Sequence, residues 1–286
     1  MQPGCVKVAF LQSGRAEEVA MTGPAANRVR TSRDGALLHV VLAAPGHGNT
    51  IDLDFTVGLA AALADLADVR CIALTSEGSN FCLGGDIGGF AAARDPGGHV
   101  DELARDLHEN LLRLDTAGVP VVVGVQGWAA GAGLGLVLAA DIAVLERSAR
   151  LRTAYTAIGL SPDGGVSWRL PRAVGTARAM DLLLTNRPMG AEEALVAGLA
   201  SRIVDDGTAA KAALEIAGEI AAGPPAALAA TRALVRAGRT RSFGQHLDAE
   251  RVAISAQAGG PEGREGVAAF LARRVPQWTA DDPPAT

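Results

Sequence analysis

Short apolar runs that alternate with helical patterns constrain the fold of this chain more than any other feature of its sequence. Four runs rich in β-branched residues are typical of buried strands, at positions 37–42, 69–75, 120–125 and 142–145. Apolar residues at helical spacing separate them, over 55–66, 101–114 and 133–140. Strands that alternate with helices pair in parallel through right-handed crossovers, so the sequence predicts an α/β protein with a parallel sheet.

The character of the chain changes after Pro171, where one helical pattern follows another. These patterns cover 176–184, 191–196, 208–222, 226–237, 243–257 and 265–274. We therefore expect a disordered tail over 1–27, a core over 28–205 and a C-terminal helical part over 206–286. The first strand is expected to begin only near Leu37, and Met21 is a candidate for the native start.

Composition and charge argue against several classes of partner and site. The net charge is −5 and no basic block stands out, which argues against nucleic acid. No apolar run reaches membrane-spanning length, and the apolar piece at 8–11 is too short for a secretory signal, so no membrane partner is expected. Three cysteines are too few for a disulfide framework and five histidines show no metal-ligand spacing, so we expect a cytoplasmic protein without a metal site.

Two segments rich in glycine and alanine form the strongest candidate for a functional site. FCLGGDI at 81–87 and QGWAAGAG at 126–133 each follow a predicted strand and lead into a predicted helix. Small residues at such corners leave backbone N–H groups uncovered, and the start of a helix adds positive partial charge. Two corners that face each other would form an oxyanion hole for a reacting carbonyl.

The same glycines permit a dinucleotide-binding interpretation, which the sequence disfavours. Leu136 stands where the fingerprint needs its third glycine, and no acidic residue lies at 152–156 to hold a ribose. Taken alone, the run from Gly131 to Gly135 would only let a helix pack closely on a strand.

Together with three further segments, these motifs closely resemble the crotonase superfamily, the enoyl-CoA hydratase/isomerase group. The further segments are 45–52 with Asn49-Thr50-Ile51-Asp52, 159–172 with GLSPDGG and RLPR, and 262–276 with EGREG. The match runs from about residue 33 to residue 278, in order. The resemblance implies a crotonase (ClpP-like) fold, a spiral of ββα units whose C-terminal helices form a trimerisation or lid region. It also implies a homotrimer or hexamer and a coenzyme A thioester as substrate, with no further cofactor.

The resemblance also assigns residues to the site. The two oxyanion donors correspond to the backbone N–H groups of Gly85 and Ala132. Leu83, Asp86 and Ile87 fall in the segment that lines the adenine end of the CoA site in relatives, although a helix cap is the favoured role of Asp86. Trp128 is expected as a wall of the pocket.

The acids depart from the pattern of the hydratases in this family, which use two glutamates. Gly135 and Tyr155 stand at those positions, and Glu146 is the only glutamate between 110 and 191. Asp163 matches the loop position at which relatives that shift double bonds carry an aspartate. A single carboxylate suits that reaction, although Pro-Asp-Gly is also an ordinary turn sequence.

Three functions remain open from the sequence. The favoured one is a Δ3-Δ2-enoyl-CoA isomerase-like reaction with Asp163 as acid and base. The alternatives are an enoyl-CoA hydratase with unconventional acid/base residues, such as a water held by Tyr155, and an acyl-CoA binding protein with little turnover. We expect Tyr155 to pack with one hydrogen bond beside the acyl chain. His99 and His108 are expected to face solvent or to play a structural role.

Overall fold

The computed structural model describes residues 17–18 and 28–278, and a seven-stranded sheet forms its centre. The strands in spatial order are β1 Glu17–Glu18, β2 Val29–Asp34, β3 Leu37–Leu42, β4 Cys71–Ser76, β5 Val121–Val125, β7 Ile142–Glu146 and β10 Arg202–Val204. The ladder from β3 to β10 is parallel throughout, as predicted, and β1, β2 and β3 pair antiparallel. The remainder of the predicted tail, 1–16 and 19–27, lies outside the described residues.

The prediction that the first strand begins near Leu37 is wrong, because β2 precedes it. β2 pairs with β3 from Val29 opposite Leu42 to Asp34 opposite Leu37. Its sequence VRTSRD buries only Val29 and Thr31, which face inward at alternate positions. A strand with one apolar residue carries almost no periodic signal, and backbone pairing with β3 supplies what the side chains lack.

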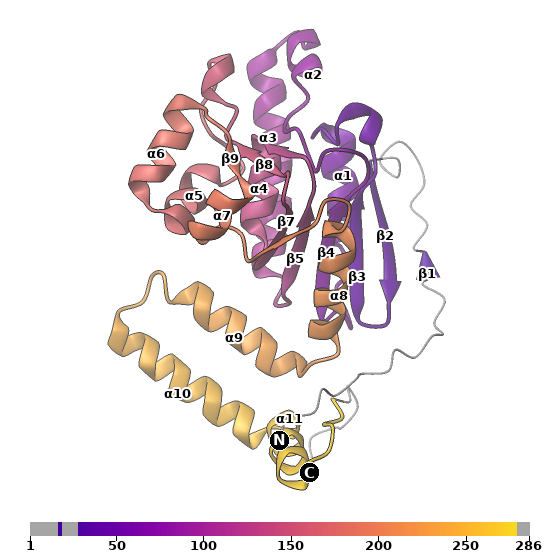
Figure 1. Cartoon of the computed structure of the whole chain (residues 1–286), viewed down its shortest axis with the longest axis vertical. Coiled ribbons are helices and arrows are strands. Elements are labelled where there is room, and N and C mark those ends of the chain that lie inside the picture. The colour runs from indigo at the N-terminus through magenta and orange to yellow at the C-terminus, as the bar shows by residue number, and fades with distance from the viewer. Residues whose placement is uncertain (1–16, 19–27, 279–286) are drawn as a thin grey trace.

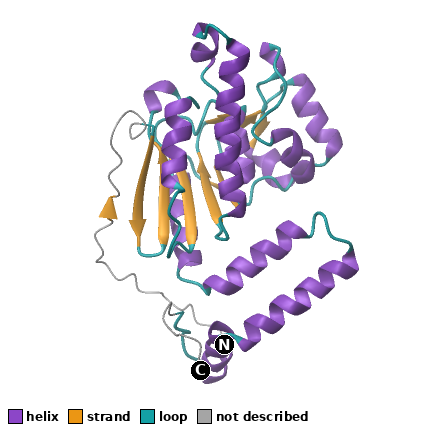
Figure 2. Ribbon diagram, turned by 180° about the vertical axis from the view of Figure 1, so that it is seen from behind, coloured by secondary structure: helices purple, strands orange, loops and turns teal. Residues whose placement is uncertain are grey.

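Helices cover both faces of the sheet (Figures 1 and 2). On one face, α1 Leu53–Ala62, α3 Pro96–Thr116 and α4 Ala132–Ala139 share the main apolar core with the strands. On the other, α8 Ala209–Ala221 lays Ala213, Ile216 and Ala217 on β4, β5 and β7. Its approach is so close that a Cβ on Gly124 would lie 2.7 Å from the Ala209 carbonyl oxygen. This contact explains the abundance of small residues on both sides.

A second, three-stranded sheet and several short helices flank the carboxyl end of the main sheet. The strands are β6 Trp128–Ala130, β8 Arg150–Arg152 and β9 Met189–Gly190, and the helices are η2 Pro45–His47, α2 Ile87–Ala92, η3 Thr156–Ile158, α5 Val166–Val174, α6 Thr176–Thr185 and α7 Ala191–Val196. The sequence did not predict α5, because Pro171 lies inside it. Val166, Leu170 and Val174 are buried along one side, and this packing outweighs the one backbone hydrogen bond that proline removes.

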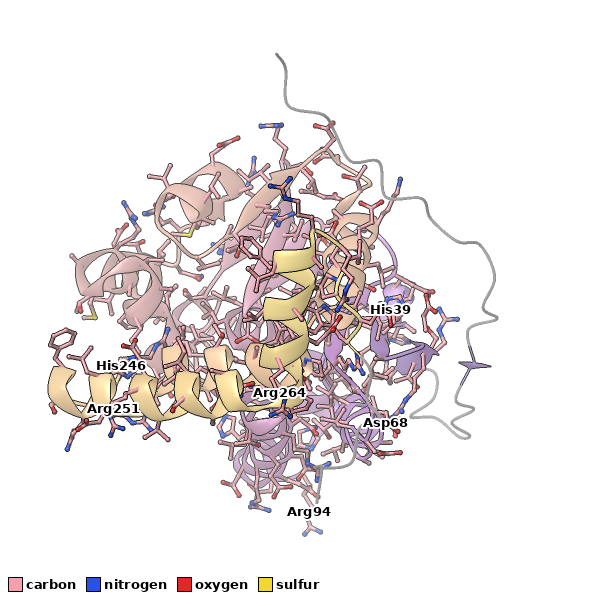
Figure 3. The ribbon with its side chains drawn as sticks, turned by 90° about the horizontal axis from the view of Figure 1, so that it is seen from below. His39, Asp68, Arg94, His246, Arg251 and Arg264 are labelled. Atoms are coloured by element: carbon pink, nitrogen blue, oxygen red, sulfur yellow. The ribbon has the colours of Figure 1, made fainter. Side chains whose placement is uncertain are left out.

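The C-terminal helical part expected from residue 206 begins with α8, which packs on the sheet. Beyond it, α9 Pro225–Ala237, α10 Phe243–Gly259 and α11 Pro261–Ala272 extend away from the core (Figure 1). The last helix begins at Pro261, four residues before the predicted start, because proline and Glu262 suit its first turn. From below, α10 runs across the end of the molecule, with His246 and Arg251 on it, and Arg264 lies on α11 (Figure 3).

Ion pairs fasten α9 to the core. The Arg232 guanidinium donates to Asp141 Oδ2 at 2.7 Å and to the Leu114 carbonyl at 2.8 Å, and its side chain is only 7% exposed. Arg236, one turn later, donates to Asp141 Oδ1 at 2.7 Å and also pairs with Asp115. Among the helices that the structure describes, none is both long and apolar enough to cross a membrane.

Candidate active site

The two glycine-rich corners predicted from the sequence lie side by side in the structure. The segment after β4 runs parallel to β6, with Cys82 N–H donating to the Trp128 carbonyl at 3.1 Å and Ala130 N–H to the Cys82 carbonyl at 2.9 Å. On its other side, Ile51 N–H donates to the Gly84 carbonyl at 2.8 Å. The loop at 48–51, the first corner and β6 therefore form one hydrogen-bonded unit that fixes both corners.

Glycine is required at both corners. Gly84 has φ of 92°, and a Cβ there would lie 2.9 Å from the Ala130 carbonyl oxygen. Gly131 has φ of 53° and precedes α4, whose first residue is Ala132. No carbonyl of the described residues accepts a hydrogen bond from the N–H of Gly85 or Ala132. Both amides are therefore left available to a ligand, and the one at Ala132 lies at a helix N-terminus.

A pocket of about 380 Å³ opens at these amides. Gly85, Ala132 and Asp163 all line it, so the structure brings together the three residues that the sequence singled out for chemistry. The rest of the wall is mainly apolar side chains from the loop before α1, the first corner, α2, α3, η3 and the loop before α5: Ile51, Leu83, Ile87, Phe90, Val100, Leu103, Leu107, Ile158 and Leu160. Such a chamber suits an apolar chain with one polar group at its mouth.

The residues predicted to bind substrate divide into two groups. Leu83, Ile87 and Tyr155 line the pocket. Asp86 does not; its carboxylate accepts from Gly88 N–H at 3.1 Å and caps α2, the role favoured from the sequence. Trp128 lies in β6 beside Arg150 and is not among the described residues that line this pocket, so its expected place in the wall stays a prediction.

Tyr155 is buried against the loop that carries Asp163. Its hydroxyl donates to the backbone carbonyl of Asp163 at 3.2 Å. Burial raises the pKa of the phenol far above its usual range, and the negative charge of Asp163 adds to the effect. Tyr155 is therefore neutral and serves as a hydrogen-bond donor, as its sequence context suggested.

The helix α4 approaches the loop before α5 so closely that position 135 has no room for a side chain. A Cβ on Gly135 would lie 2.5 Å from the Gly164 carbonyl oxygen. Gly164 itself adopts φ of 57° and lies against Ala132. Glu146, the only glutamate between 110 and 191, is held at the end of β7 by a 2.8 Å hydrogen bond from Gly207 N–H.

His108 is a residue of this site that the sequence left in a solvent-facing or structural role. Its Nε2 atom accepts from Gly164 N–H at 3.1 Å and lies 3.9 Å from Asp163 Oδ2. The two residues are separated by a long stretch of chain, and His108 sits on an exposed turn of α3. No local sequence pattern predicts such a pair. The only indication in the sequence was that His108 lies on the helix expected to border the pocket.

Two other kinds of site find little support here. Among residues 17–18 and 28–278, no three His, Cys, Asp or Glu side chains lie close enough together to hold a metal ion. Cys82 lies in the first corner, but burial raises the pKa of its thiol to about 12. A thiol with that pKa is almost wholly protonated near neutral pH and is a poor nucleophile.

Comparison with known proteins places this geometry in context. The family model for enoyl-CoA hydratase/isomerase matches residues 32–281. The chain is 37% identical over 216 residues to 1,2-epoxyphenylacetyl-CoA isomerase of Escherichia coli, covering 74% of this chain and 81% of that protein. It is 39% identical over 213 residues to the "Probable enoyl-CoA hydratase" of Rhodobacter capsulatus, covering 74% and 82%. The crystal structure of an enoyl-CoA hydratase from Polaromonas superposes with a TM-score of 0.83 at 32% identity, over 88% of this chain and 99% of that one.

Proposed function

Because the chain belongs to the enoyl-CoA hydratase/isomerase family of the crotonase superfamily, we propose that it is a Δ3-Δ2-enoyl-CoA isomerase-like enzyme. One observation carries this choice of reaction. Of the described residues that line the pocket, only Asp163 bears a carboxylate, and the free amides of Gly85 and Ala132 line the same pocket. A double-bond shift needs one carboxylate, whereas hydration needs a base for water and an acid for carbon.

The amides of Gly85 and Ala132 are proposed to hold the thioester oxygen of the acyl-CoA. As a proton leaves C2, charge moves onto that oxygen, and two N–H donors aimed at it lower the energy of the resulting dienolate. The start of α4 adds positive partial charge at the Ala132 amide. Loss of one such donor typically lowers the rate roughly 10²- to 10³-fold.

Asp163 is proposed to move the proton. Its carboxylate takes a proton from C2, and the C2–H electron pair becomes part of a dienolate that spans the thioester oxygen and C4. The same carboxyl group then returns the proton to C4, so that the double bond lies between C2 and C3 and the residue regains its charge. The apolar walls formed by α2 and α3 exclude water that would compete for this proton.

Two features of the site argue against hydration. The first glutamate position of the hydratases is Gly135, where a Cβ would collide with the Gly164 carbonyl. The second is Tyr155, a neutral phenol whose proton is engaged with the Asp163 carbonyl. Neither residue can take a proton from water near neutral pH.

Tyr155→Phe is expected to leave catalysis largely intact. The change removes one hydroxyl and leaves the Asp163 carbonyl without that donor, so the free energy of unfolding should fall by about 1 kcal/mol. We expect kcat to fall by no more than about 10-fold, because no proton transfer passes through the phenol and its loss reaches Asp163 only through the peptide group. Urea unfolding and steady-state kinetics measure the two effects. A loss of kcat as large as that of an Asp163 variant would make the hydroxyl part of the chemistry.

Product analysis tests the proposed function directly. The protein is offered a 3-enoyl-CoA and the matching 2-enoyl-CoA in separate samples in D₂O, and the products are identified by NMR. We expect conversion of the 3-enoyl to the 2-enoyl compound without a 3-hydroxy product. Formation of 3-hydroxyacyl-CoA from either substrate at a comparable rate would replace the isomerase proposal with the hydratase alternative.

The expected homotrimer or hexamer remains a proposal. The C-terminal helices carry large apolar side chains that are mostly exposed in the single chain, among them Phe243, Ile254, Phe270 and Leu271. Burial of these side chains in an interface would remove apolar surface from water, and further copies of this chain are the partners that the resemblance suggests.

A further inference from the structure

The Asp163–Gly164 peptide group is held at both of its polar ends by the side chains of two other residues. Its carbonyl oxygen accepts from the Tyr155 hydroxyl at 3.2 Å, and its N–H donates to His108 Nε2 at 3.1 Å. A peptide group is planar, so two hydrogen bonds at its ends fix the orientation of that plane. The Cα atom of Asp163 lies in this plane, and the carboxylate is attached through it. Gly164 has φ of 57°, and because glycine adopts many backbone conformations, this residue by itself does not fix the position of the loop.

We infer that His108 is a positioning residue for Asp163, and that it acts only while its Nε2 atom is unprotonated. This inference deepens the proposed function and rests on it for its effect on turnover. The contact itself stands on geometry, because a hydrogen bond from Gly164 N–H requires a lone pair on Nε2. The neutral imidazole therefore carries its proton on Nδ1.

Protonation of His108 reverses the role of Nε2 from acceptor to donor. The bond from Gly164 N–H is then lost, and the new N–H finds the Asp163 carboxylate, whose Oδ2 atom is 3.9 Å away. The carboxylate that should take a proton from substrate becomes paired with an imidazolium. Protonation of His108 is therefore expected to lower turnover through the position of Asp163.

The surroundings leave His108 free to respond to solvent. Its side chain is 47% exposed and lines a second cavity of about 420 Å³ beside the pocket. The charged groups at that cavity, Asp115 on α3 and Arg169 on α5, are paired with each other at 2.6 Å. Arg105, one turn before His108 on α3, is paired with Asp101. Asp163 is thus the charged partner within reach of Nε2.

His108→Gln and His108→Leu separate positioning from mere packing. The glutamine Oε1 can accept from Gly164 N–H in place of Nε2, whereas leucine fills similar space without an acceptor. We expect His108→Leu to lower kcat about 10- to 100-fold with KM within about 3-fold, because a small displacement of a catalytic group is costly. His108→Gln should keep kcat within about 3-fold and lose the histidine ionisation on the acid side of the kcat profile. His246→Gln is the control, because it makes the same substitution on α10, outside the pocket, and should leave kcat unchanged (Figure 3).

NMR of the full-length protein tests the contact independently of activity. In ¹⁵N-labelled wild type, the Gly164 amide should shift with the titration of His108, and in His108→Gln it should not. A Gly164 amide that ignores the titration would overturn the inference, whether or not the protein shifts double bonds. A His108→Gln variant as impaired as His108→Leu would also overturn it, by making the imidazole itself indispensable. The wild type could also lack isomerase activity while its Gly164 amide still shifts with the titration of His108. That result would reject both the role in turnover and the proposed function, but it would support the contact between His108 and Gly164.

Discussion

Asp163→Asn is expected to abolish double-bond migration while acyl-CoA binding stays within a few-fold of the wild type. The amide has almost the volume of the carboxylate and cannot take a proton from C2. Since the proposed mechanism uses the same carboxylate for both proton transfers, kcat should fall by at least about 10³-fold. Binding depends instead on the amides of Gly85 and Ala132 and on the apolar wall of the pocket, which the substitution leaves in place.

Kinetics with a 3-enoyl-CoA and calorimetric titration with a saturated acyl-CoA measure the two quantities. Asp68→Asn is a matched control, because it removes a carboxylate from an exposed position with φ of 60°, which asparagine tolerates (Figure 3). Near-normal turnover in Asp163→Asn would remove this residue from the mechanism. A parallel loss of kcat and of acyl-CoA affinity would instead indicate that the loop before α5 had moved.

The architecture was within reach of the sequence because it rests on strong local patterns. Buried parallel strands such as β4 and β5 are continuous apolar runs, and their alternation with α1 and α3 indicated the parallel sheet. The comparisons confirm the expected crotonase fold. β2 and α5 were missed for opposite reasons. β2 is polar and gains its order from pairing with β3, while α5 keeps its helix through packing despite Pro171.

The candidate site was predictable only where one short segment carries the information. The glycines at 84 and 131 predict corners with uncovered amides, because both have positive φ, which residues with a side chain rarely adopt. His108 and Gly164 meet only after α3 and the loop before α5 have packed, and no spacing in the sequence encodes that contact.

The absence of a side chain at Gly135 has one meaning in the sequence and another in the structure. In the sequence it is a lost glutamate, and restoring that glutamate looks like a route to hydration. In the structure, the backbone of α4 lies so near the loop before α5 that a Cβ would come 2.5 Å from the Gly164 carbonyl oxygen. The loop that carries Asp163 thus occupies the space that a glutamate on α4 would need, and the two arrangements exclude each other.

Gly135→Glu is therefore expected to damage the protein rather than to convert it. Overpacking at Gly164 should lower the free energy of unfolding by about 1–3 kcal/mol, and burial of the new carboxylate adds to this. Displacement of the loop should lower isomerase kcat by more than about 10²-fold, with no 3-hydroxyacyl-CoA formed. Gly218→Glu, in α8, is the matched control, because a Cβ there meets nothing within 4 Å. Urea unfolding and product analysis test this prediction. If Gly135→Glu were as stable as Gly218→Glu and also hydrated a 2-enoyl-CoA, the loop would have moved aside without cost. The steric argument against hydration in this pocket would then be wrong.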